Sequence, residues 1–371
     1  MGLLTKPEQP WCTGGVGRFC GTLVRALSRR GDTEIILLVH EKPEFDLDVP
    51  HVRVRVIEPP ISKGLPYLSR VINKRIDQRN FEYQGKTAIL FYSMKLTSNL
   101  AARLKAQHIP AVIWVNSDLA ADDGKFNSEY LQKQYREYLN AADVIVAQNS
   151  YQVQGLQRYY HRETAMITAG IIDSSMPTAG PVPTIVPSSN KRPQLLWVGR
   201  SAGIKRPWVL EQIANRLPEF SLIAVLSKEL DDQLYRTVIY DLERCDNVTL
   251  IPTLAHEDLI ALYHEDIIAI NTSASEGLPN TFLEAANASR PFISMDIDLD
   301  GLLSGHAGNG AIGLCAHGDL DLMCQMIRDL ASDPGRRQRI GQAAHDYVFK
   351  HWDADKVAAQ WVELMDTLAA S

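Results

Sequence analysis

Two glutamates in the second half of the chain, Glu276 and Glu284, frame a short segment that contains glycine and proline. The apolar run at 267–270 before them predicts a buried parallel strand, and the apolar residues from Phe282 onward have helical spacing. Pro279 suits the first position of a helix, because its missing N–H has no hydrogen-bond partner to lose there. The segment is therefore predicted to be a strand, a loop and a helix whose first N–H groups can bind a phosphate.

The two carboxylates can bind the groups on either side of that phosphate. Glu276 precedes the predicted helix, and Glu284 lies inside it. A carboxylate that accepts hydrogen bonds from a vicinal diol gains about 1.5–3 kcal/mol per bond. A phosphate between two diol-binding carboxylates fits a nucleotide-diphospho-sugar, with ribose at one end and hexose at the other. The alternative is an ordinary surface helix that carries two glutamates.

Two basic residues follow another predicted strand. An apolar run over 194–199 ends at Gly199, and Arg200 and Lys205 come soon after it. The carboxyl ends of strands in an open parallel sheet face the ligand crevice, and fixed cations there can stabilise the charge on a departing phosphate group. The alternative is a pair of ordinary surface basic residues. Arg206, which precedes a proline, is expected to point elsewhere.

Strands and helices alternate along both halves of the chain, which predicts an α/β fold with two doubly wound domains. In the first half we expect strands at 2–5, 35–39, 88–92, 111–115 and 143–147, and helices at 19–29, 132–139 and 151–160. In the second half we expect strands at 194–199, 222–226, 248–251, 267–270, 291–294 and 311–314, and helices at about 207–217, 229–242, 256–264 and 354–368.

A linker is expected between the two domains. Five prolines lie between residues 177 and 193, with serine and asparagine among them. This is a linker composition. We therefore expect an N-terminal domain at 1–178, a C-terminal domain at 190–349 and a final helix within 350–371.

A glycine-rich loop with Gly14 and Gly15 joins the first predicted strand to the first helix, which makes a Rossmann-like opening. The spacing Gly14-Gly15-x-Gly17 is not the dinucleotide fingerprint, and no acidic residue closes the strand at 35–39. Both facts argue against a dinucleotide site. The loop is either part of a ligand site or a tight turn that needs glycine torsions.

Asp118 lies just past the predicted strand at 111–115, after Asn116 and Ser117. A carboxylate at this edge of the sheet can orient or deprotonate a hydroxyl group of a substrate. It can equally serve as the N-cap of the next helix. Both interpretations stay open on the sequence alone.

Residues 63–79 form a basic amphipathic stretch, with five basic residues against one aspartate and a stripe of apolar residues. One interpretation is the solvated face of a helix that packs on a core. The other is a weak contact with anionic lipid headgroups or with a lipid-diphosphate acceptor.

Composition excludes several classes of protein. The 371 residues are 45% hydrophobic and 22% charged, and no apolar run approaches the roughly 20 residues of a membrane span. The net charge is −6, and no segment is basic enough to predict nucleic-acid binding. The five cysteines form no C-x-x-C pair, so we expect free thiols and no metal site. With no signal peptide expected at the N-terminus, a cytoplasmic protein is predicted, or one peripheral to the inner membrane face.

The segment from Glu276 to Ala285 resembles the E-x7-E motif of retaining GT-B glycosyltransferases, family 4 in particular. The resemblance implies two Rossmann-like domains that face a central cleft, with the last helix packed on the first domain. It implies that Glu276 faces the donor sugar, that Glu284 holds the ribose, and that the site needs no metal or other cofactor. Further donor contacts are implied for Gly14, Gly15, Gly199, Arg200, Lys205, Gly277, Leu278, Asn280 and Thr281.

The implied activity is transfer of a hexose from a UDP- or GDP-sugar to a hydroxyl group on a saccharide or lipid-linked acceptor, in polysaccharide, lipopolysaccharide or glycoconjugate synthesis. Two features depart from the family pattern. Asn116 to Asp118 stand where many relatives have a histidine, and Met295 to Gly301 replace a Gly-Gly-x-Pro-Glu segment. The alternatives are a GT-B hydrolase or epimerase that needs no acceptor, and a scaffold that binds sugar nucleotides without turnover.

Overall fold

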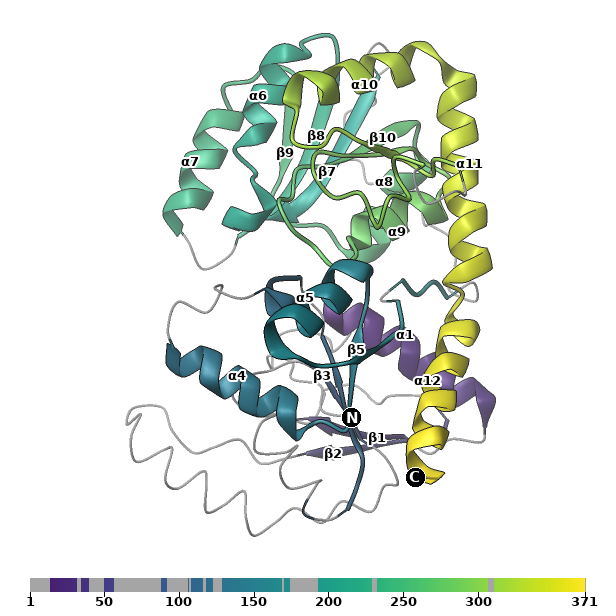
Figure 1. Cartoon of the computed structure of the whole chain (residues 1–371). Coiled ribbons are helices and arrows are strands. Elements are labelled where there is room, and N and C mark those ends of the chain that lie inside the picture. The colour runs from purple at the N-terminus through teal and green to yellow at the C-terminus, as the bar shows by residue number, and fades with distance from the viewer. Residues whose placement is uncertain are drawn as a thin grey trace. The chain divides into compact units, whose positions relative to one another are not determined.

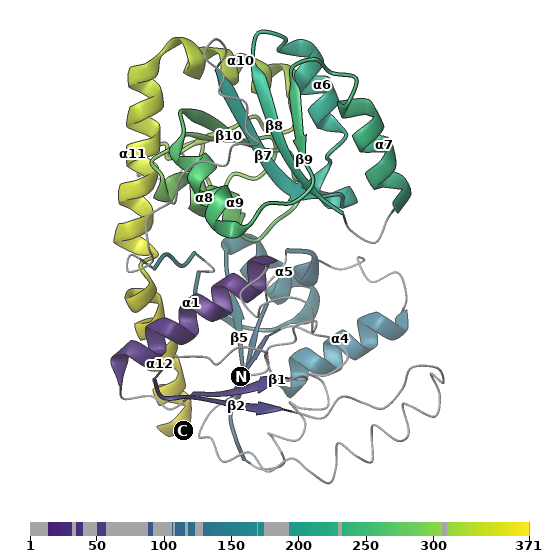
Figure 2. The same cartoon turned by 180° about the vertical axis from the view of Figure 1, so that it is seen from behind.

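The computed structural model describes residues 14–31, 35–39, 50–56, 88–91, 106, 108–115, 118–122, 129–168, 170–173, 193–228, 232–305 and 310–370. The expected strand at 2–5, the basic stretch 63–79 and most of the proline-rich segment lie outside these residues. The chain divides into two compact units, one of residues 1–171 with 354–371 and one of residues 172–353 (Figures 1 and 2). The last helix therefore belongs with the first unit, and the division falls at 171/172, before the proline-rich segment.

The first unit contains two parallel sheets. Strands β3, β4, β5 and β6 form a four-stranded sheet in sequence order, and β1 pairs with β2. Its described elements are α1 (Gly14–Arg30), β1 (Ile35–Val39), β2 (Val52–Val56), β3 (Ala88–Phe91), β4 (Ala111–Trp114), η1 (Asp118–Ala121), α4 (Glu129–Ala141), β5 (Val144–Ala147), α5 (Ser150–Tyr160), β6 (Thr164–Met166) and α12 (Ala354–Ala370).

Helices cover both faces of the four-stranded sheet. Alternate residues of a strand point to opposite faces, and in β4 Trp114 packs with α1 and α12 whereas Ile113 packs with α4 and α5. Helix α12 lies beside α1, and the buried Trp361 is part of their shared core. Arg29 of α1 also donates to the carboxylate of Asp355, with an Nη2–Oδ1 distance of 2.8 Å.

In the first unit one predicted boundary was wrong, and a strand was missed. Helix α1 begins at Gly14 and not at residue 19, so Gly14 and Gly15 form its first turn and not a separate loop. The first N–H groups of a helix have no partner within the helix, which makes its first turn a site where glycine costs less than in the interior. Strand β2 was not predicted, although its sequence VRVRV alternates as a half-buried strand does.

The second unit is a six-stranded parallel sheet with the order β12-β11-β10-β7-β8-β9. Its strands are β7 (Gln194–Arg200), β8 (Ser221–Ser227), β9 (Val248–Ile251), β10 (Ile267–Asn271), β11 (Phe292–Ser294) and β12 (Leu314–Cys315). Its helices are η2 (Gly203–Lys205), α6 (Val209–Arg216), α7 (Asp232–Leu242), α8 (His256–His264), α9 (Asn280–Asn287), α10 (Leu320–Ser332) and α11 (Pro334–His351).

Two apolar clusters hold this sheet between layers of helices. On one face α6, α7 and α10 pack against the strands, and on the other α8, α9 and α11 do so (Figures 1 and 2). The central strands β7 and β10 are buried on both faces, as their continuous apolar sequences predicted. The doubly wound fold expected for this half is therefore confirmed.

The last strand was predicted at 311–314 and is found at Leu314–Cys315. The preceding residues pair with a neighbouring turn instead, since the N–H of Ile312 donates to the carbonyl of Leu302 at 3.2 Å. Glycine suits position 313 because a Cβ atom there would clash with Leu303, at 2.6 Å from its Cδ2 atom. Residues 312–313 therefore pack against the turn at 302–303, and the strand begins only at Leu314.

Among the helices that the structure describes, none combines the length and the apolar character that crossing a membrane requires.

Candidate active site

The order of the second sheet defines where a ligand can bind. The strand order reverses between the neighbouring strands β7 and β10, so the chain leaves their carboxyl ends in opposite directions. In open α/β sheets ligands bind at this switch point, outside the carboxyl ends of the strands. The segment with η2 follows β7 there, and the segment that leads into α9 follows β10. The end of β7 and these two segments carry Arg200, Lys205 and Glu276.

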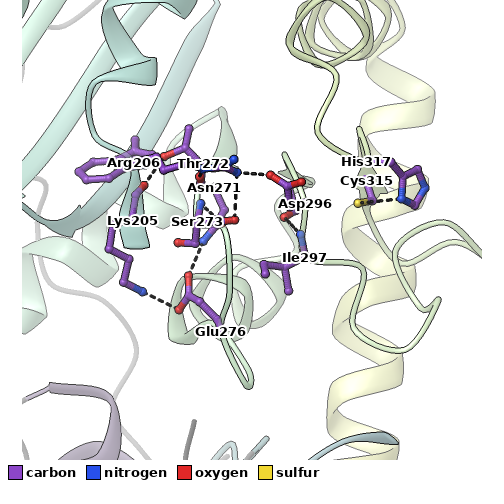
Figure 3. A network of polar contacts seen from close by, with 12 residues as sticks. Lys205, Arg206, Asn271, Thr272, Ser273, Glu276, Asp296, Ile297, Cys315 and His317 are labelled. Carbon is purple, nitrogen blue, oxygen red and sulfur yellow. Dashed lines mark hydrogen bonds and ion pairs between the residues drawn. The ribbon is translucent and has the colours of Figure 1, made fainter. Parts of the chain in front are cut away.

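Lys205 and Glu276 meet across the switch point. The Nζ atom of Lys205 lies 2.6 Å from Oε2 of Glu276, and the side chains are 21% and 13% exposed (Figure 3). The other carboxylate oxygen, Oε1, accepts a hydrogen bond of 2.9 Å from Nδ2 of Asn271, the buried last residue of β10. Both oxygens of Glu276 are thus held. The sequence had not pointed to Asn271.

Backbone contacts join the segments that carry this pair. The hydroxyl of Thr272 donates to the carbonyl of Lys205 at 2.7 Å, and accepts from the indole Nε1 of Trp197 at 3.0 Å. The N–H of Ala274 donates to the carbonyl of Ile204 at 2.9 Å. Because these contacts fix both backbones, the side chains of Lys205 and Glu276 start from defined positions.

Arg206 was expected to point elsewhere, and that prediction was wrong. Its Nε donates to the carbonyl of Thr272 at 2.6 Å and its Nη2 to the carbonyl of Ser273 at 3.3 Å. The same guanidinium forms an ion pair with Asp296, which follows β11 (Figure 3). Arg206 therefore ties together the segments that follow three neighbouring strands.

Helix α9 begins beside this network. Pro279 occupies its N-cap position and not the first helical position that the sequence suggested, and no side chain caps the helix. The hydroxyl oxygen of Thr281, in the first turn, is shielded from solvent and has no hydrogen-bond partner among the described residues. Glu284 lies on the same helix and is 8% exposed. An uncapped helix start with a shielded hydroxyl suits an anionic ligand.

The remaining donor-side residues divide between structural and surface positions. Gly199 faces the ring of Trp197, and a Cβ atom on it would lie 2.6 Å from Trp197 Cη2. Arg200 is the exposed last residue of β7. Leu278 is partly buried and packs against the apolar core of the second unit.

Asp118 lies in the first unit, at the start of η1, and is buried. Its Oδ1 accepts hydrogen bonds of 2.9 Å from Nδ2 of Asn149 and from Nε2 of Gln152. Asn149 is itself the N-cap of α5. These hydrogen bonds of Asp118 therefore anchor η1 to the start of α5.

The described residues hold no group of three or more His, Cys, Asp or Glu side chains placed to bind a metal ion. The Sγ atom of Cys315 lies 3.6 Å from Nδ1 of His317, but burial raises the pKa of this thiol. A raised pKa lowers the thiolate fraction at neutral pH and makes Cys315 a poor nucleophile.

Comparison with known protein families matches each half of the chain to a glycosyltransferase model. Residues 13–172 match the model described as Glycosyltransferase Family 4, and residues 192–333 match the model described as Glycosyl transferases group 1. A curated relative, Glycosyltransferase 1 domain-containing protein 1 of Xenopus tropicalis, is 27% identical over 143 residues. That match covers 36% of this chain and 38% of the frog protein.

Solved structures with the same fold cover the whole chain. Sucrose-phosphate synthase from Thermosynechococcus elongatus has a TM-score of 0.79 at 17% identity and covers 100% of this chain and 99% of its own. Anabaena HepE in complex with UDP-glucose has a TM-score of 0.71 at 16% identity and covers 99% of both chains. The two family matches and the two parallel-sheet α/β domains place this chain among the glycosyltransferases of the GT-B fold.

Proposed function

We propose that the protein is a retaining glycosyltransferase that moves a hexose from a UDP- or GDP-sugar to a hydroxyl group of a saccharide or lipid-linked acceptor. The observation that carries the proposal is the meeting of Lys205 and Glu276 at the switch point, 2.6 Å apart, beside the uncapped start of α9. A cation, a carboxylate and a helix N-terminus at one sheet edge offer separate contacts for a phosphate and a sugar. Related folds support a nucleotide-sugar donor, because HepE has been solved with UDP-glucose.

Each end of the donor has an assigned partner in this proposal. The diphosphate lies against Lys205, Arg200 and the backbone N–H groups of Gly277, Leu278, Asn280 and Thr281. The shielded Thr281 hydroxyl gains a phosphate oxygen as partner. Glu284, buried on the same helix, accepts from the ribose hydroxyls, and Glu276 accepts from the hexose.

Donor binding changes the partner of Lys205. In the structure its ammonium group is paired with Glu276. A diphosphate carries more negative charge than a carboxylate, so it competes for Lys205 and leaves Glu276 to the sugar hydroxyls. Asn271 keeps its 2.9 Å hydrogen bond to Glu276 and holds the carboxylate in place during this exchange.

In the reaction, the bond between the anomeric carbon and the diphosphate oxygen breaks, and its electron pair leaves with the diphosphate. The acceptor oxygen bonds to the anomeric carbon on the same face, and its proton passes to the departing diphosphate. Lys205, Arg200 and the start of α9 stabilise the charge that develops on the leaving group, and no metal ion is required in this scheme. We assign the acceptor to the first unit, where Asp118 lies, and keep Gly14 and Gly15 as contacts to the donor.

The test is release of nucleoside diphosphate from a panel of UDP-, GDP- and ADP-sugars, first without acceptor and in the presence of EDTA. We expect slow release from one donor, and its loss in the Glu276→Ala variant. Arg328→Gln is the matched control, because Arg328 pairs with Glu219 just before the amino end of β8, at the opposite edge of the sheet. No release from any donor, or equal release by Glu276→Ala, contradicts the proposed function.

Product analysis separates the transferase from its alternatives. A transferase gains rate when its acceptor is added and yields a product with the anomeric configuration of the donor. A hydrolase or epimerase yields free or epimerised sugar without acceptor, and a scaffold binds the donor and releases nothing.

A further inference from the structure

We propose that Arg206 is a positioning residue that fixes Lys205 and Glu276 in the geometry that receives the donor. The inference rests on the proposed function for the identity of that ligand, but not for the mechanical role of Arg206. Its basis is the backbone conformation of Arg206, the contacts of its guanidinium group and its place in the chain, directly after Lys205.

The backbone of Arg206 is left-handed, with φ 47° and ψ 54°. Glycine adopts this region freely, whereas a residue with a Cβ atom is disfavoured there. Such a conformation persists where the surrounding structure determines it, and it often marks a functional constraint. An arginine occupies this position, and its side chain makes contacts that glycine could not make.

The guanidinium supplies contacts to two other strand ends. It donates to the carbonyls of Thr272 and Ser273 after β10 and pairs with Asp296 after β11. The Arg206 and Asp296 side chains are 21% and 29% exposed, so the pair is largely shielded. The planar fork of arginine can serve several acceptors at fixed angles, which a lysine cannot do.

These contacts control the position of the candidate active-site pair. Arg206 pulls the segment 272–273 toward η2, and the Thr272 hydroxyl in turn holds the carbonyl of Lys205. Glu276 lies four residues beyond Thr272 on the same segment. The Nε and Nη2 atoms of Arg206 donate to protein acceptors. Arg206 therefore positions the site and is not itself catalytic.

The decisive variant is Arg206→Gly, which accepts the left-handed backbone and removes only the side-chain ties. Ser289→Gly is the matched control, because Ser289 has a φ of 54° at the other end of α9 and gains the same backbone relief. Arg206→Lys keeps the charge but loses the fork. All three are compared with the wild-type protein by melting temperature, by amide hydrogen exchange, by UDP titration and by the kinetics of nucleoside diphosphate release from the donor identified above.

We expect faster hydrogen exchange over residues 271–276 in Arg206→Gly, including the Ala274 amide that bonds to Ile204. We expect UDP affinity and kcat/KM to fall about 10- to 100-fold, as for a site displaced by about 1 Å. Ser289→Gly should match the wild type in hydrogen exchange over 271–276, in UDP affinity and in kcat/KM. Arg206→Lys should give values between those of the wild type and those of Arg206→Gly. The melting temperature of Arg206→Gly should stay close to that of Ser289→Gly, which separates positioning from general destabilisation.

Unchanged exchange over 271–276 in Arg206→Gly overturns the inference, and so does faster exchange with wild-type UDP affinity and turnover. A wild-type protein that binds no nucleoside diphosphate refutes the proposed function instead. In that case the exchange comparison still decides whether Arg206 holds the segment.

Discussion

Replacing Asn271 with aspartate changes one hydrogen-bonding group at the centre of the site. The Nδ2 atom of Asn271 donates to Glu276 at 2.9 Å, while its Oδ1 accepts from the N–H of Ser273 at 2.9 Å. Aspartate keeps the second contact and has almost the same shape. The variant therefore places a carboxylate oxygen against Glu276 and leaves the rest of the network in place.

The penalty can be worked from this distance. Two unit charges 2.9 Å apart repel by about 6 kcal/mol at an effective dielectric constant of about 20. Proton uptake limits this cost, because protonating a carboxyl group of ordinary pKa near 4 at pH 7 costs about 4 kcal/mol and restores an O–H donor. After relaxation of the loop we expect Asn271→Asp to lower the free energy of unfolding by about 2–4 kcal/mol at pH 7.

The pH dependence gives the sign that distinguishes this mechanism. As pH falls from 7 to 5, protonation of the carboxyl pair becomes cheaper by about 1.4 kcal/mol per unit, so the difference from wild type should shrink at up to that rate. The assay is urea denaturation at pH 5, 6 and 7, followed by circular dichroism. Asn215→Asp is the control, since Asn215 also donates to a glutamate, Glu211, at 3.4 Å on an exposed helix face.

The control should cost no more than about 0.5 kcal/mol, as expected for exposed like charges four residues apart on a helix. If Asn271→Asp is no more destabilising than Asn215→Asp, or if its penalty does not shrink with falling pH, the hydrogen bond from Asn271 to Glu276 does not hold the carboxylate as described.

Further predictions concern two close-packed glycines, Gly199 and Gly155, and the buried thiol of Cys324. Gly199→Ala should lower the free energy of unfolding by about 1–3 kcal/mol through the clash with Trp197. Adding Trp197→Phe should relieve that clash, so the double variant should lose less free energy of unfolding than the two single variants together. Gly155→Ala should destabilise the first unit by a similar amount, seen as a lower urea midpoint, because its Cβ would lie 2.2 Å from the carbonyl oxygen of Ala121 and push α5 off η1. Burial raises the pKa of the Cys324 thiol, so the stability it contributes is present below the unfolded thiol pKa of about 8.5 and is lost as pH rises through the higher folded pKa. Cys324→Ala should therefore show a shallower loss of stability between pH 8 and 10, and an equal slope would refute this assignment.

The sequence predicted the second unit well because its central strands are long apolar runs. Buried parallel strands such as β7 and β10 leave a clear signal, and the rule for strand ends then places Lys205 and Glu276 at one edge. The rule is consistent with the direct contact between Lys205 and Glu276, but it does not predict that contact. A one-dimensional pattern gives the edge of the sheet on which a side chain lies, and leaves open which side chain it meets.

The outcome for Arg206 depended on contacts with a distant part of the chain, which a local sequence pattern does not reveal. Arg206 was expected to point away because a proline follows it, yet its acceptors lie 66 and 67 residues on. Gly199 looked like a ligand-binding glycine, and its neighbour Trp197 gives it a packing reason as well. Strand β2 was overlooked although its alternating sequence carried a usable signal.

The most direct test of the proposed site is calorimetric titration of UDP, and then GDP, into the protein with EDTA present. We predict one binding site per chain for at least one of the two nucleotides. Lys205→Ala should weaken it about 10- to 100-fold, the loss expected for one charge-assisted hydrogen bond to phosphate. Arg328→Gln, which removes a cation at the other edge of the same sheet, should bind as the wild type does. Absence of binding for both nucleotides, or wild-type affinity in Lys205→Ala, would contradict a nucleotide-sugar site at the meeting point of Lys205 and Glu276.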